Sequence, residues 1–355
     1  MKSKRHHQEG GIFTKKFHKN FSSLLHSRKY SQYFILCDDN TNVSCLPVLM
    51  NEIPELAQAI VIKIYAGEGH KNIQALEYVW KRLTEENADR NAVLINLGGG
   101  MICDLGGFAA GTYKRGIDFI HVPTTLLGLV DAAIGGKQGI DFLHFKNQIG
   151  VFKNPDVFIH PSFLLTLPEE QMRSGFAEVV KHALIAGGKF WKQVRVIESM
   201  KEVNWKPLIE ESISLKVAVT EVDPMEKKFR KVLNFGHTIG HAIESVLLSN
   251  NQNTLHGFCV AAGMIGELYL SSIIGGLSPK KRDEALSFIK KHFPLLSFSE
   301  NDFDAILSFM KQDKKNHGGK IRMVLLKKFG EPKIDCEVDE VMIREALNFM
   351  IRSYD

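Results

Sequence analysis

Short apolar runs alternate with longer amphipathic stretches through the first half of the chain. Four runs rich in β-branched or aromatic residues have the length of buried strands: residues 33–36, 59–65, 92–97 and 118–122. Between the second and third runs, residues 72–87 repeat apolar side chains at helical spacing, with Leu76, Val79 and Leu83 on one face. Strands separated by helices of this length predict a parallel α/β sheet.

The pattern changes at about Leu165, after which long helical periodicities dominate. The expected helices cover residues 168–186, 205–221, 236–248, 257–274 and 280–292. One short late strand is expected at residues 321–326. We therefore predict an α/β protein with an N-terminal parallel-sheet domain, residues 1–165, and a mainly helical C-terminal domain, residues 166–355.

Composition and charge narrow the class of protein. The chain has 355 residues, of which 44% are hydrophobic and 24% charged, as in ordinary globular proteins. Its net charge of +5 is too small to predict nucleic-acid binding, although it suits a pocket for an anionic metabolite as well as it suits a basic surface. Much of the excess lies in the first thirty residues, where we expect a frayed basic end instead of a targeting peptide. We expect no membrane span, because no apolar run approaches about 20 residues.

The cysteines indicate a reducing compartment. There are five, which is an odd number, and no two of them form a C-x-x-C pair: Cys37, Cys45, Cys103, Cys259 and Cys336. Scattered cysteines of this kind are typical of reduced thiols, so we expect a cytoplasmic protein without a cysteine metal cluster.

A glycine run follows the third expected strand. Gly98-Gly99-Gly100 leads into a helix that continues through Asp104 to Gly106-Gly107. Without side chains, such a turn can bring backbone N–H groups against a phosphate at a helix N-terminus. The spacing is not G-x-G-x-x-G, and glycines in tight turns are as often there for steric reasons. The run alone leaves both interpretations open.

Two lysines stand in segments that glycines mark as loops. The first segment runs from Asp131 through Gly135-Gly136 to Lys137, and the second contains Lys146 and Asn147 before Gly150. Either lysine alone would be interpreted as a surface residue. Two in loops near the carboxyl edge of the sheet favour a phosphate site.

The helical half contains residues that could bind a metal. Glu178 and Lys181 are three apart on one helix face, which usually indicates a surface ion pair. His237 and His241 are four apart on one face, a spacing that suits two zinc ligands, but the Glu of H-E-x-x-H is missing. His256 begins another helix, where a lone histidine is usually a cap or a core residue. One glutamate and two histidines would make a catalytic zinc site.

In combination, the motifs resemble those of the 3-dehydroquinate synthase family from about Tyr30 to Gly330. The matching segments are GGG-x-x-x-DLGGF at 98–108, VPTTLL at 122–127, VD-x-x-x-GGK at 130–137, KN-x-IG at 146–150, G-x-AEV-x-K at 175–181, N-x-GH-x-x-GHA-x-E at 234–244, LHG at 255–257, GM at 263–264 and DKK at 313–315. The resemblance implies a Rossmann-like N-terminal domain that binds NAD and a helical C-terminal domain that binds zinc (or cobalt).

The family's cofactor contacts carry over to matching positions of this sequence. The implied metal ligands are Glu178, His237 and His256, which leaves His241 for the substrate phosphate. The implied NAD contacts are Asp39 (or Asp38), Asn42, Glu68, Lys71, Gly99, Gly100, Asp104, Thr124, Thr125 and Thr166.

The resemblance also implies the substrate, a phosphorylated seven-carbon keto acid, and the residues that contact it. These are Asp131, Lys137, Lys146, Asn147, Lys181, Lys216, Glu226, Arg230, Asn234, His241 and either Lys314 or Lys315. Lys216 and Arg230 would hold the carboxylate, while Lys137, Asn147, His241 and the late lysine would hold the phosphate. Arg115 matches an arginine that reaches the neighbouring subunit's site, which implies a homodimer.

The sequence departs from the family pattern at five positions. Gln138 stands where Thr is usual, and Phe145, His182, Phe258 and Cys103 replace Gly, Tyr, Glu and Gly. None of the five changes removes a metal ligand or a charged contact. We therefore expect them to alter details of fit more than the activity.

The implied activity is that of 3-dehydroquinate synthase (EC 4.2.3.4), which releases phosphate from 3-deoxy-D-arabino-heptulosonate 7-phosphate in the shikimate pathway and regenerates NAD in each turnover. Three alternatives remain. They are a valiolone- or inosose-type cyclase, a metal-dependent alcohol or glycerol dehydrogenase of the same fold, and a non-catalytic metal- or nucleotide-binding protein. Retention of Lys216, Arg230 and Asn234 argues against the first, and the Lys146-Asn147 pair argues against the second.

Overall fold

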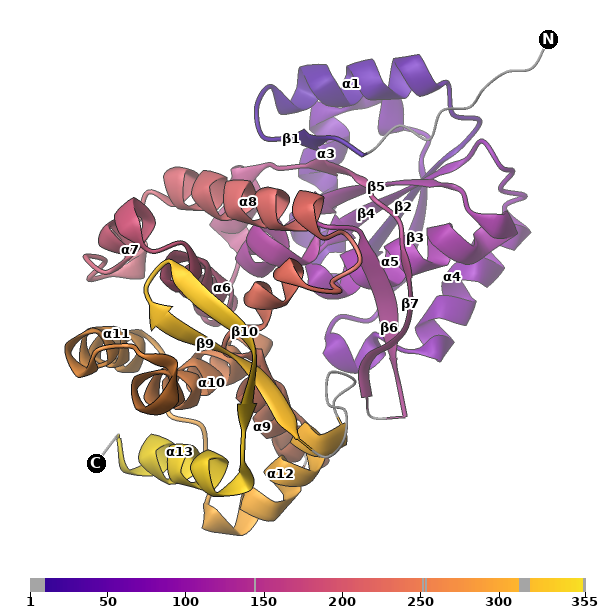
Figure 1. Cartoon of the computed structure of the whole chain (residues 1–355). Helices are drawn as coiled ribbons and strands as arrows, with labels where there is room; N and C mark the ends of the chain where they lie inside the picture. The colour runs from indigo at the N-terminus through magenta and orange to yellow at the C-terminus, as the bar shows by residue number, and fades with distance from the viewer. Residues whose placement is uncertain (1–9, 144, 251, 253, 313–319, 354–355) are drawn as a thin grey trace. The chain divides into compact units, whose positions relative to one another are not determined.

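The computed structural model describes residues 10–143, 145–250, 252, 254–312 and 320–353 (Figure 1). They fall into two compact units, the first ending at Pro168 and the second beginning at Glu169. The first unit contains a six-stranded sheet and the second is largely helical. The predicted α/β class is confirmed.

The sheet of unit 1 is parallel throughout. Its strands are β1 (Ile12–Phe13), β2 (Tyr33–Asp38), β3 (Ile60–Ile64), β4 (Val93–Gly98), β5 (Asp118–Pro123) and β8 (Asp156–Phe158), in the spatial order β1-β8-β5-β4-β2-β3. The four predicted strands are confirmed as β2 to β5. The order reverses between β2 and β4, because the chain runs outward from β2 to β3 and in the other direction from β4 to β5. This reversal is the point at which ligands bind in open α/β sheets.

Helices cover both faces of this sheet (Figure 1). They are α1 (Phe17–Arg28), α2 (Asp39–Ser44), α3 (Leu46–Glu52), α4 (Ile73–Glu85) and α5 (Gly100–Thr112). Along β2, Phe34 and Leu36 pack in the core formed with α4 and α5, whereas Ile35 and Cys37 pack in the core formed with α1 to α3. Successive strand residues face opposite sides, so both faces are apolar and the strands read as continuous hydrophobic runs.

The second lysine segment predicted as a loop, residues 146–150, lies in a strand of a β-hairpin, so that prediction is wrong. The first segment forms a turn and bends over residues 131–136, and only Lys137 at its end belongs to the hairpin. Strands β6 (Lys137–Phe142) and β7 (Phe145–Phe152) pair antiparallel in a separate two-stranded sheet. Gly139 lies opposite Gly150, and a Cβ on Gly150 would come within 2.2 Å of the Gln138 carbonyl oxygen. The glycines therefore allow close strand pairing in this segment and do not mark an irregular loop.

Unit 2 is built mainly from helices. They are α6 (Glu169–Ala186), α7 (Gly188–Val194), α8 (Trp205–Val222), α9 (His237–Ser249), α10 (His256–Leu270), α11 (Pro279–His292), α12 (Phe303–Gln312) and α13 (Glu340–Arg352). The five predicted helices are confirmed as α6 and α8 to α11. The predicted late strand is β9 (Ile321–Lys328), and it pairs with β10 (Glu331–Val338), which the sequence pattern did not predict.

The segment His256–Gly275 is long and apolar enough to span a membrane by length and composition, contrary to our expectation that no run approaches that length. Within unit 2, however, 72% of its most apolar window is buried. The segment comprises α10 and the π-helical turn Ser271–Gly275 that follows it. It is therefore a core helix, which explains why it is apolar on all sides.

Candidate active site

The predicted cofactor residues of unit 1 follow the carboxyl ends of four adjacent strands. Asp39 and Asn42 begin after β2, Glu68 and Lys71 after β3, Gly99 and Gly100 after β4, and Thr124 and Thr125 after β5. Parallel strands end at one edge of a sheet, so the fold brings these residues to one edge. Thr166 joins them, because both Thr124 and Thr166 hydrogen-bond the Cys45 side chain.

The two acidic residues at the end of β2 have different surroundings. The Asp38 carboxylate is buried and caps α2, with its Oδ1 accepting from the Thr41 backbone N–H at 2.8 Å. Asp39 is half-buried, with 42% of its side chain exposed, and it lies 3.3 Å from the Lys63 ammonium. A ribose hydroxyl needs an accessible carboxylate, so the structure favours Asp39 over Asp38 for that contact.

The glycine turn has a packing reason at each position. A Cβ on Gly98 would meet Ile102 at 2.5 Å, and a Cβ on Gly99 would meet Thr125 at 2.9 Å. Helix α5 begins at Gly100 without a side-chain cap, so its first N–H groups point out of the sheet edge as a possible anion site. Steric need and phosphate binding are therefore compatible explanations for this turn.

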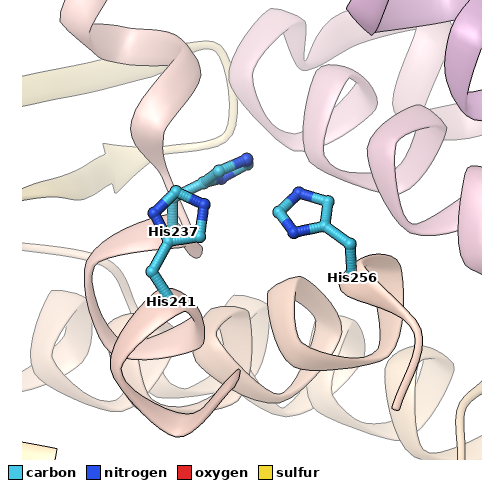
Figure 2. A group of neighbouring side chains, drawn as sticks. All are labelled: His237, His241 and His256. Carbon is cyan, nitrogen blue, oxygen red and sulfur yellow. The ribbon is translucent and has the colours of Figure 1, made fainter. Parts of the chain in front are cut away.

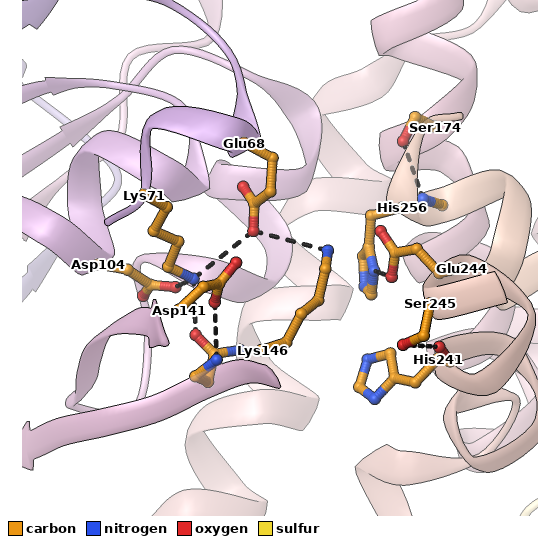
Figure 3. A network of polar contacts seen from close by, with 12 residues as sticks. Glu68, Lys71, Asp104, Asp141, Lys146, Ser174, His241, Glu244, Ser245 and His256 are labelled. Carbon is orange, nitrogen blue, oxygen red and sulfur yellow. Dashed lines mark hydrogen bonds and ion pairs between the residues drawn. The ribbon is translucent and has the colours of Figure 1, made fainter. Parts of the chain in front are cut away.

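A polar cluster beside this turn joins predicted cofactor and substrate residues (Figure 3). The Lys71 ammonium lies 2.6 Å from both Asp104 Oδ2 and Asn147 Oδ1. Glu68 Oε1 lies between two cations, 3.8 Å from Lys71 and 3.6 Å from Lys146. Asp141, which sequence reasoning missed, accepts the Asn147 backbone N–H at 2.7 Å.

Charge compensation holds this cluster together. Lys71 is only 3% exposed, and burial by itself would lower the pKa of its ammonium. The carboxylates of Asp104 and Glu68 outweigh that effect and raise the Lys71 pKa above its usual value. Burial raises the pKa of the Asp141 carboxyl. Lys71 is therefore a permanent cation that fixes the position of the Asn147 amide.

Three of the predicted site residues have an unusual backbone conformation. Arg115, Asn147 and Glu226 have φ angles of 68°, 51° and 54°, in the left-handed region that non-glycine residues rarely adopt. Arg115 is exposed on a turn in which its neighbours Lys114 and Gly116 also have positive φ. Such strain accumulates at functional sites, where surrounding structure maintains it.

Two other predicted residues of unit 1 lie close to the sheet. Asp131 is half-buried in the π-helical turn Gly128–Ala132. Lys137 is exposed at the first position of β6. Gln138, the next residue, is buried and accepts a hydrogen bond from His121 at 3.2 Å. Gln138 thus occupies a buried site in which a shorter threonine could not make this contact.

The predicted metal ligands of unit 2 gather on three helices. Glu178 lies on α6, His237 begins α9 and His256 begins α10. Glu178 Oε1 is 3.4 Å from His237 Nε2 and 3.8 Å from His256 Nε2, and Lys181 forms an ion pair with the other carboxylate oxygen. One ring nitrogen each of His237, His241 and His256 lies within 4.8 Å of the other two (Figure 2).

Small residues let α9 and α10 approach closely enough to form this group. A Cβ on Gly263 would lie 2.0 Å from the Gly236 carbonyl oxygen, and one on Gly240 would lie 2.6 Å from the Cys259 carbonyl oxygen. The buried Glu267 carboxylate on α10 accepts from the backbone N–H groups of Gly236, Thr238 and Ile239. It therefore caps α9 from a neighbouring helix and fixes the start of the helix at His237.

The donor set fits a divalent metal. Two ligands at about 2.0–2.1 Å from a tetrahedral zinc ion are about 3.3 Å from each other. The 3.4 Å gap between Glu178 Oε1 and His237 Nε2 is longer than a hydrogen bond and close to that value. Glu178 is fully buried and Lys181 pairs with its Oε2, which leaves Oε1 facing the two imidazole nitrogens.

Unit 2 also buries three of the predicted substrate-binding cations. Lys181, Lys216 and Arg230 are each at most 6% exposed. The Arg230 guanidinium donates to the Pro224 carbonyl oxygen at 2.7 Å, and the Asn234 amide donates to Glu226 at 2.7 Å. Three buried cations in one unit create a locally positive environment, which suits an anionic ligand.

The remaining predictions fall in different places. Lys314 and Lys315 lie outside the described residues, as does the side chain of Phe145. Cys103 and His182 are buried, and burial raises the pKa of the Cys103 thiol. Phe258 is half-buried on α10. Sequence reasoning missed Asp141 and Glu267 because no local signal links them to partners that only the fold brings near.

The fold and the candidate site together define a class of two-unit enzymes. In this class, an α/β unit has a sheet edge that suits a nucleotide, and a helical unit contains a candidate metal centre. Family models described as "3-dehydroquinate synthase N-terminal" and "3-dehydroquinate synthase C-terminal" match residues 61–174 and 175–316. The 3-dehydroquinate synthase of Parabacteroides distasonis is 42% identical over 346 residues, which are 97% of this chain and 98% of the relative.

Two solved structures share the fold. One is 2-epi-5-epi-valiolone synthase from Streptomyces hygroscopicus with NAD+ and Zn2+ bound, with 22% identity, 99% of each chain covered and a TM-score of 0.84. The other is 2-deoxy-scyllo-inosose synthase with carbaglucose-6-phosphate, NAD+ and Co2+, with 24% identity, 95% of each chain covered and a TM-score of 0.79. The chain belongs to the 3-dehydroquinate synthase family. Its activity is that of a 3-dehydroquinate synthase, EC 4.2.3.4.

Proposed function

We propose that this enzyme converts 3-deoxy-D-arabino-heptulosonate 7-phosphate to 3-dehydroquinate and phosphate in the shikimate pathway, with NAD and zinc (or cobalt) as cofactors. The observation that carries the metal assignment is the buried Glu178 carboxylate, which one imidazole Nε2 approaches at 3.4 Å and another at 3.8 Å. Glu178, His237 and His256 would hold the metal and leave a fourth position for substrate. When bound, the metal would polarise a substrate hydroxyl and NAD+ would accept and later return the hydride.

Residues of unit 2 are proposed to bind the substrate carboxylate. Lys216 and Arg230 are buried cations, and Arg230 is held by bonds to Pro224 and to Asp223, whose carboxylate accepts the Arg230 backbone N–H at 3.0 Å. A cation held in place loses little conformational freedom on binding, which strengthens a charge-assisted bond. Asn234 and Glu226 are fixed by their mutual 2.7 Å bond and would orient substrate hydroxyls.

Phosphate contacts are proposed for the β6–β7 hairpin of unit 1 and for His241. Lys137 and Lys146 are on that hairpin, and Asn147 is held by Lys71 and Asp141. Asp131 and Lys181 complete the proposed substrate contacts. The substrate carries roughly three negative charges, so several fixed cations would neutralise it.

The NAD site is proposed at the carboxyl edge of the sheet. Asp39 and Asn42 would contact the ribose, the turn at Gly99 and Gly100 the pyrophosphate, and the residues Glu68, Lys71, Asp104, Thr124, Thr125 and Thr166 the rest of the cofactor. Support comes from the reversal of strand order between β2 and β4, where this turn lies.

We also propose a cytoplasmic homodimer. All five cysteines are free thiols, and four of them are buried, as expected in a reducing compartment. The exposed, strained turn at Arg115 supports a role for that side chain in a neighbouring subunit's site. Lys314 or Lys315 remains a proposed phosphate contact.

The test is a phosphate-release assay on protein stripped of metal by a chelator and freed of NAD. We expect release from the seven-carbon substrate only when NAD and zinc (or cobalt) are both restored. Glu178→Gln protein that is folded by circular dichroism should stay inactive under the same conditions. Full activity without metal, or in the Glu178→Gln variant, would refute the proposed site.

A further inference from the structure

Glu244 makes a contact that the proposed reaction does not use. It lies on α9, is 3% exposed, and places its Oε2 3.1 Å from His256 Nδ1 at the start of α10 (Figure 3). An ionised carboxylate can only accept a hydrogen bond. When Glu244 is ionised, Nδ1 of His256 must carry the hydrogen, and Nε2 then presents the lone pair that a metal requires.

The second ring nitrogen of His256, Nε2, faces the other two proposed ligands. His256 Nε2 is 3.8 Å from Glu178 Oε1, the carboxylate oxygen that also lies 3.4 Å from His237 Nε2. Glu244 thus holds the ring from behind while the opposite nitrogen faces the other two proposed ligands. A 27% exposed side chain at the first turn of a helix would otherwise be able to rotate.

His237 is held by a different acceptor. Its Nδ1 lies 3.1 Å from the Phe235 carbonyl oxygen, a neutral main-chain group. The tautomer of His237 therefore depends on the backbone, whereas that of His256 depends on a charged side chain. A side-chain acceptor can be removed by substitution whereas a backbone carbonyl cannot, so the contribution of Glu244 can be measured with a variant.

We propose that Glu244 is a positioning residue of the metal centre, which holds His256 as the Nδ1–H tautomer with Nε2 toward Glu178. Carboxylates behind metal-bound histidines commonly contribute about 10–100-fold to metal affinity. The inference rests on the proposed ligand assignment of Glu178, His237 and His256. A purely structural role, in which the pair only joins α9 to α10, predicts a loss of stability without a specific loss of metal affinity.

The first experiment compares Glu244→Gln with wild type in the absence of substrate. Zinc affinity of the apoprotein is measured by competition with a chromogenic chelator, and the Co2+ spectrum reports ligand geometry. We expect affinity to fall about 10–100-fold and the Co2+ spectrum to change, while the melting temperature of the apoprotein stays close to wild type. Ser245→Ala is the matched control, since Ser245 is the next residue on α9 and its Oγ donates to the His241 carbonyl oxygen of the same helix.

A double-mutant cycle then asks whether Glu244 acts through His256. Glu244→Gln should cause no further loss of zinc affinity in a His256→Ala background, because the ring that it positions is gone. Equal losses in both backgrounds would overturn the inference. If His256→Ala itself retains wild-type affinity, the ligand assignment fails instead, so the two failures are distinguishable.

A second variant covers the case in which Glu244→Gln does not fold as apoprotein. Glu244→Asp keeps the charge but withdraws the carboxylate by one methylene from His256 Nδ1. We expect an affinity between those of wild type and Glu244→Gln. Wild-type zinc affinity and an unchanged Co2+ spectrum in Glu244→Asp would overturn the inference as well.

Discussion

Single buried charges dominate the chemistry of both units at the residue scale. Lys71 in unit 1 and Glu178 in unit 2 are almost fully buried, and each is surrounded by opposite or complementary charge. A buried charge that loses its partner costs about 3–5 kcal/mol of folding stability. Both groups must therefore keep their positions relative to their partners. The proposed ligands and substrate contacts are accordingly sensitive to single substitutions.

The carboxylate site gives a prediction about substrate affinity. Lys216→Ala and Arg230→Ala should each raise the KM by about ten- to a hundred-fold, because each removes a charge-assisted bond of about 1.5–3 kcal/mol. Steady-state kinetics with the seven-carbon phosphate measures this. Lys206→Ala, an exposed lysine on the same helix as Lys216, is the control. Normal KM values in both variants would place the carboxylate site elsewhere.

His121 gives a prediction about pH. It is fully buried between Asn96 and Gln138, and burial lowers its pKa to about 3. Between about pH 6.5 and pH 3 the unfolded chain binds a proton at this residue that the folded chain does not. Acidification through that range therefore lowers the free energy of unfolding, by up to about 1.4 kcal/mol per pH unit.

Urea unfolding of wild type and His121→Gln at several pH values measures this effect. Stability of wild type should fall more steeply than that of His121→Gln between about pH 6.5 and pH 4.5. Parallel curves would show that the imidazole titrates normally in the folded protein.

Sequence reasoning predicted residues that would carry the chemistry but not the residues that hold them. Glu178, His237 and His256 belong to motifs of the family, and their spacing is visible along the chain. Glu267 acts across 28 to 31 residues on the N-terminus of α9, and Asp141 acts on Asn147 across a hairpin. Such partners depend on tertiary packing, which no local pattern specifies.

At the scale of elements, strong hydrophobic periodicity was sufficient to predict helices and strands. Glycine-rich segments, in contrast, led to a wrong prediction. The apolar runs of β2 to β5 and the long patterns of α6 and α8 to α11 were recognised, because burial of one face or of both determines the pattern. The β6–β7 hairpin was taken for loops because its glycines interrupt the strand pattern. Its pairing is specified by contacts between Gly139 and Gly150 and not by propensity.

Gly150→Ala tests the hairpin. The new Cβ would lie 2.2 Å from the Gln138 carbonyl oxygen, so the strands must separate and shift Lys146 and Asn147. We expect KM for substrate to rise at least about tenfold, the effect of one lost charge-assisted bond. Gly69→Ala is the control, since a Cβ there meets no atom within 4 Å. Wild-type kinetics in Gly150→Ala would show that the hairpin does not position these residues.

At the scale of the whole molecule, the fold does not identify the reaction. Cyclases for other substrates share it at 22% and 24% identity, whereas 42% identity over nearly the full length shows the 3-dehydroquinate synthase family. Related scaffolds support different chemistry through their sites. The reaction must therefore be tested by its products.

The proposed homodimer predicts complementation between two impaired variants, assayed at a substrate concentration well below the KM of Lys216→Ala. Arg115→Ala and Lys216→Ala homodimers should both be impaired. Mixed dimers contain one site with both lesions and one intact site, so unfolding and refolding an equal mixture should restore about a quarter of wild-type activity. Activity no higher than the mean of the two variants would contradict a shared site.

The ratio of phosphate released to NADH formed tests the central claim most directly. In the proposed reaction NAD would be the oxidant early and would be regenerated late in each turnover, so NAD should act in catalytic amounts. We expect phosphate to accumulate over many turnovers with no matching rise in nicotinamide absorbance. One NADH per substrate consumed, with phosphate retained on the product, would contradict the account and indicate a dehydrogenase on the same scaffold.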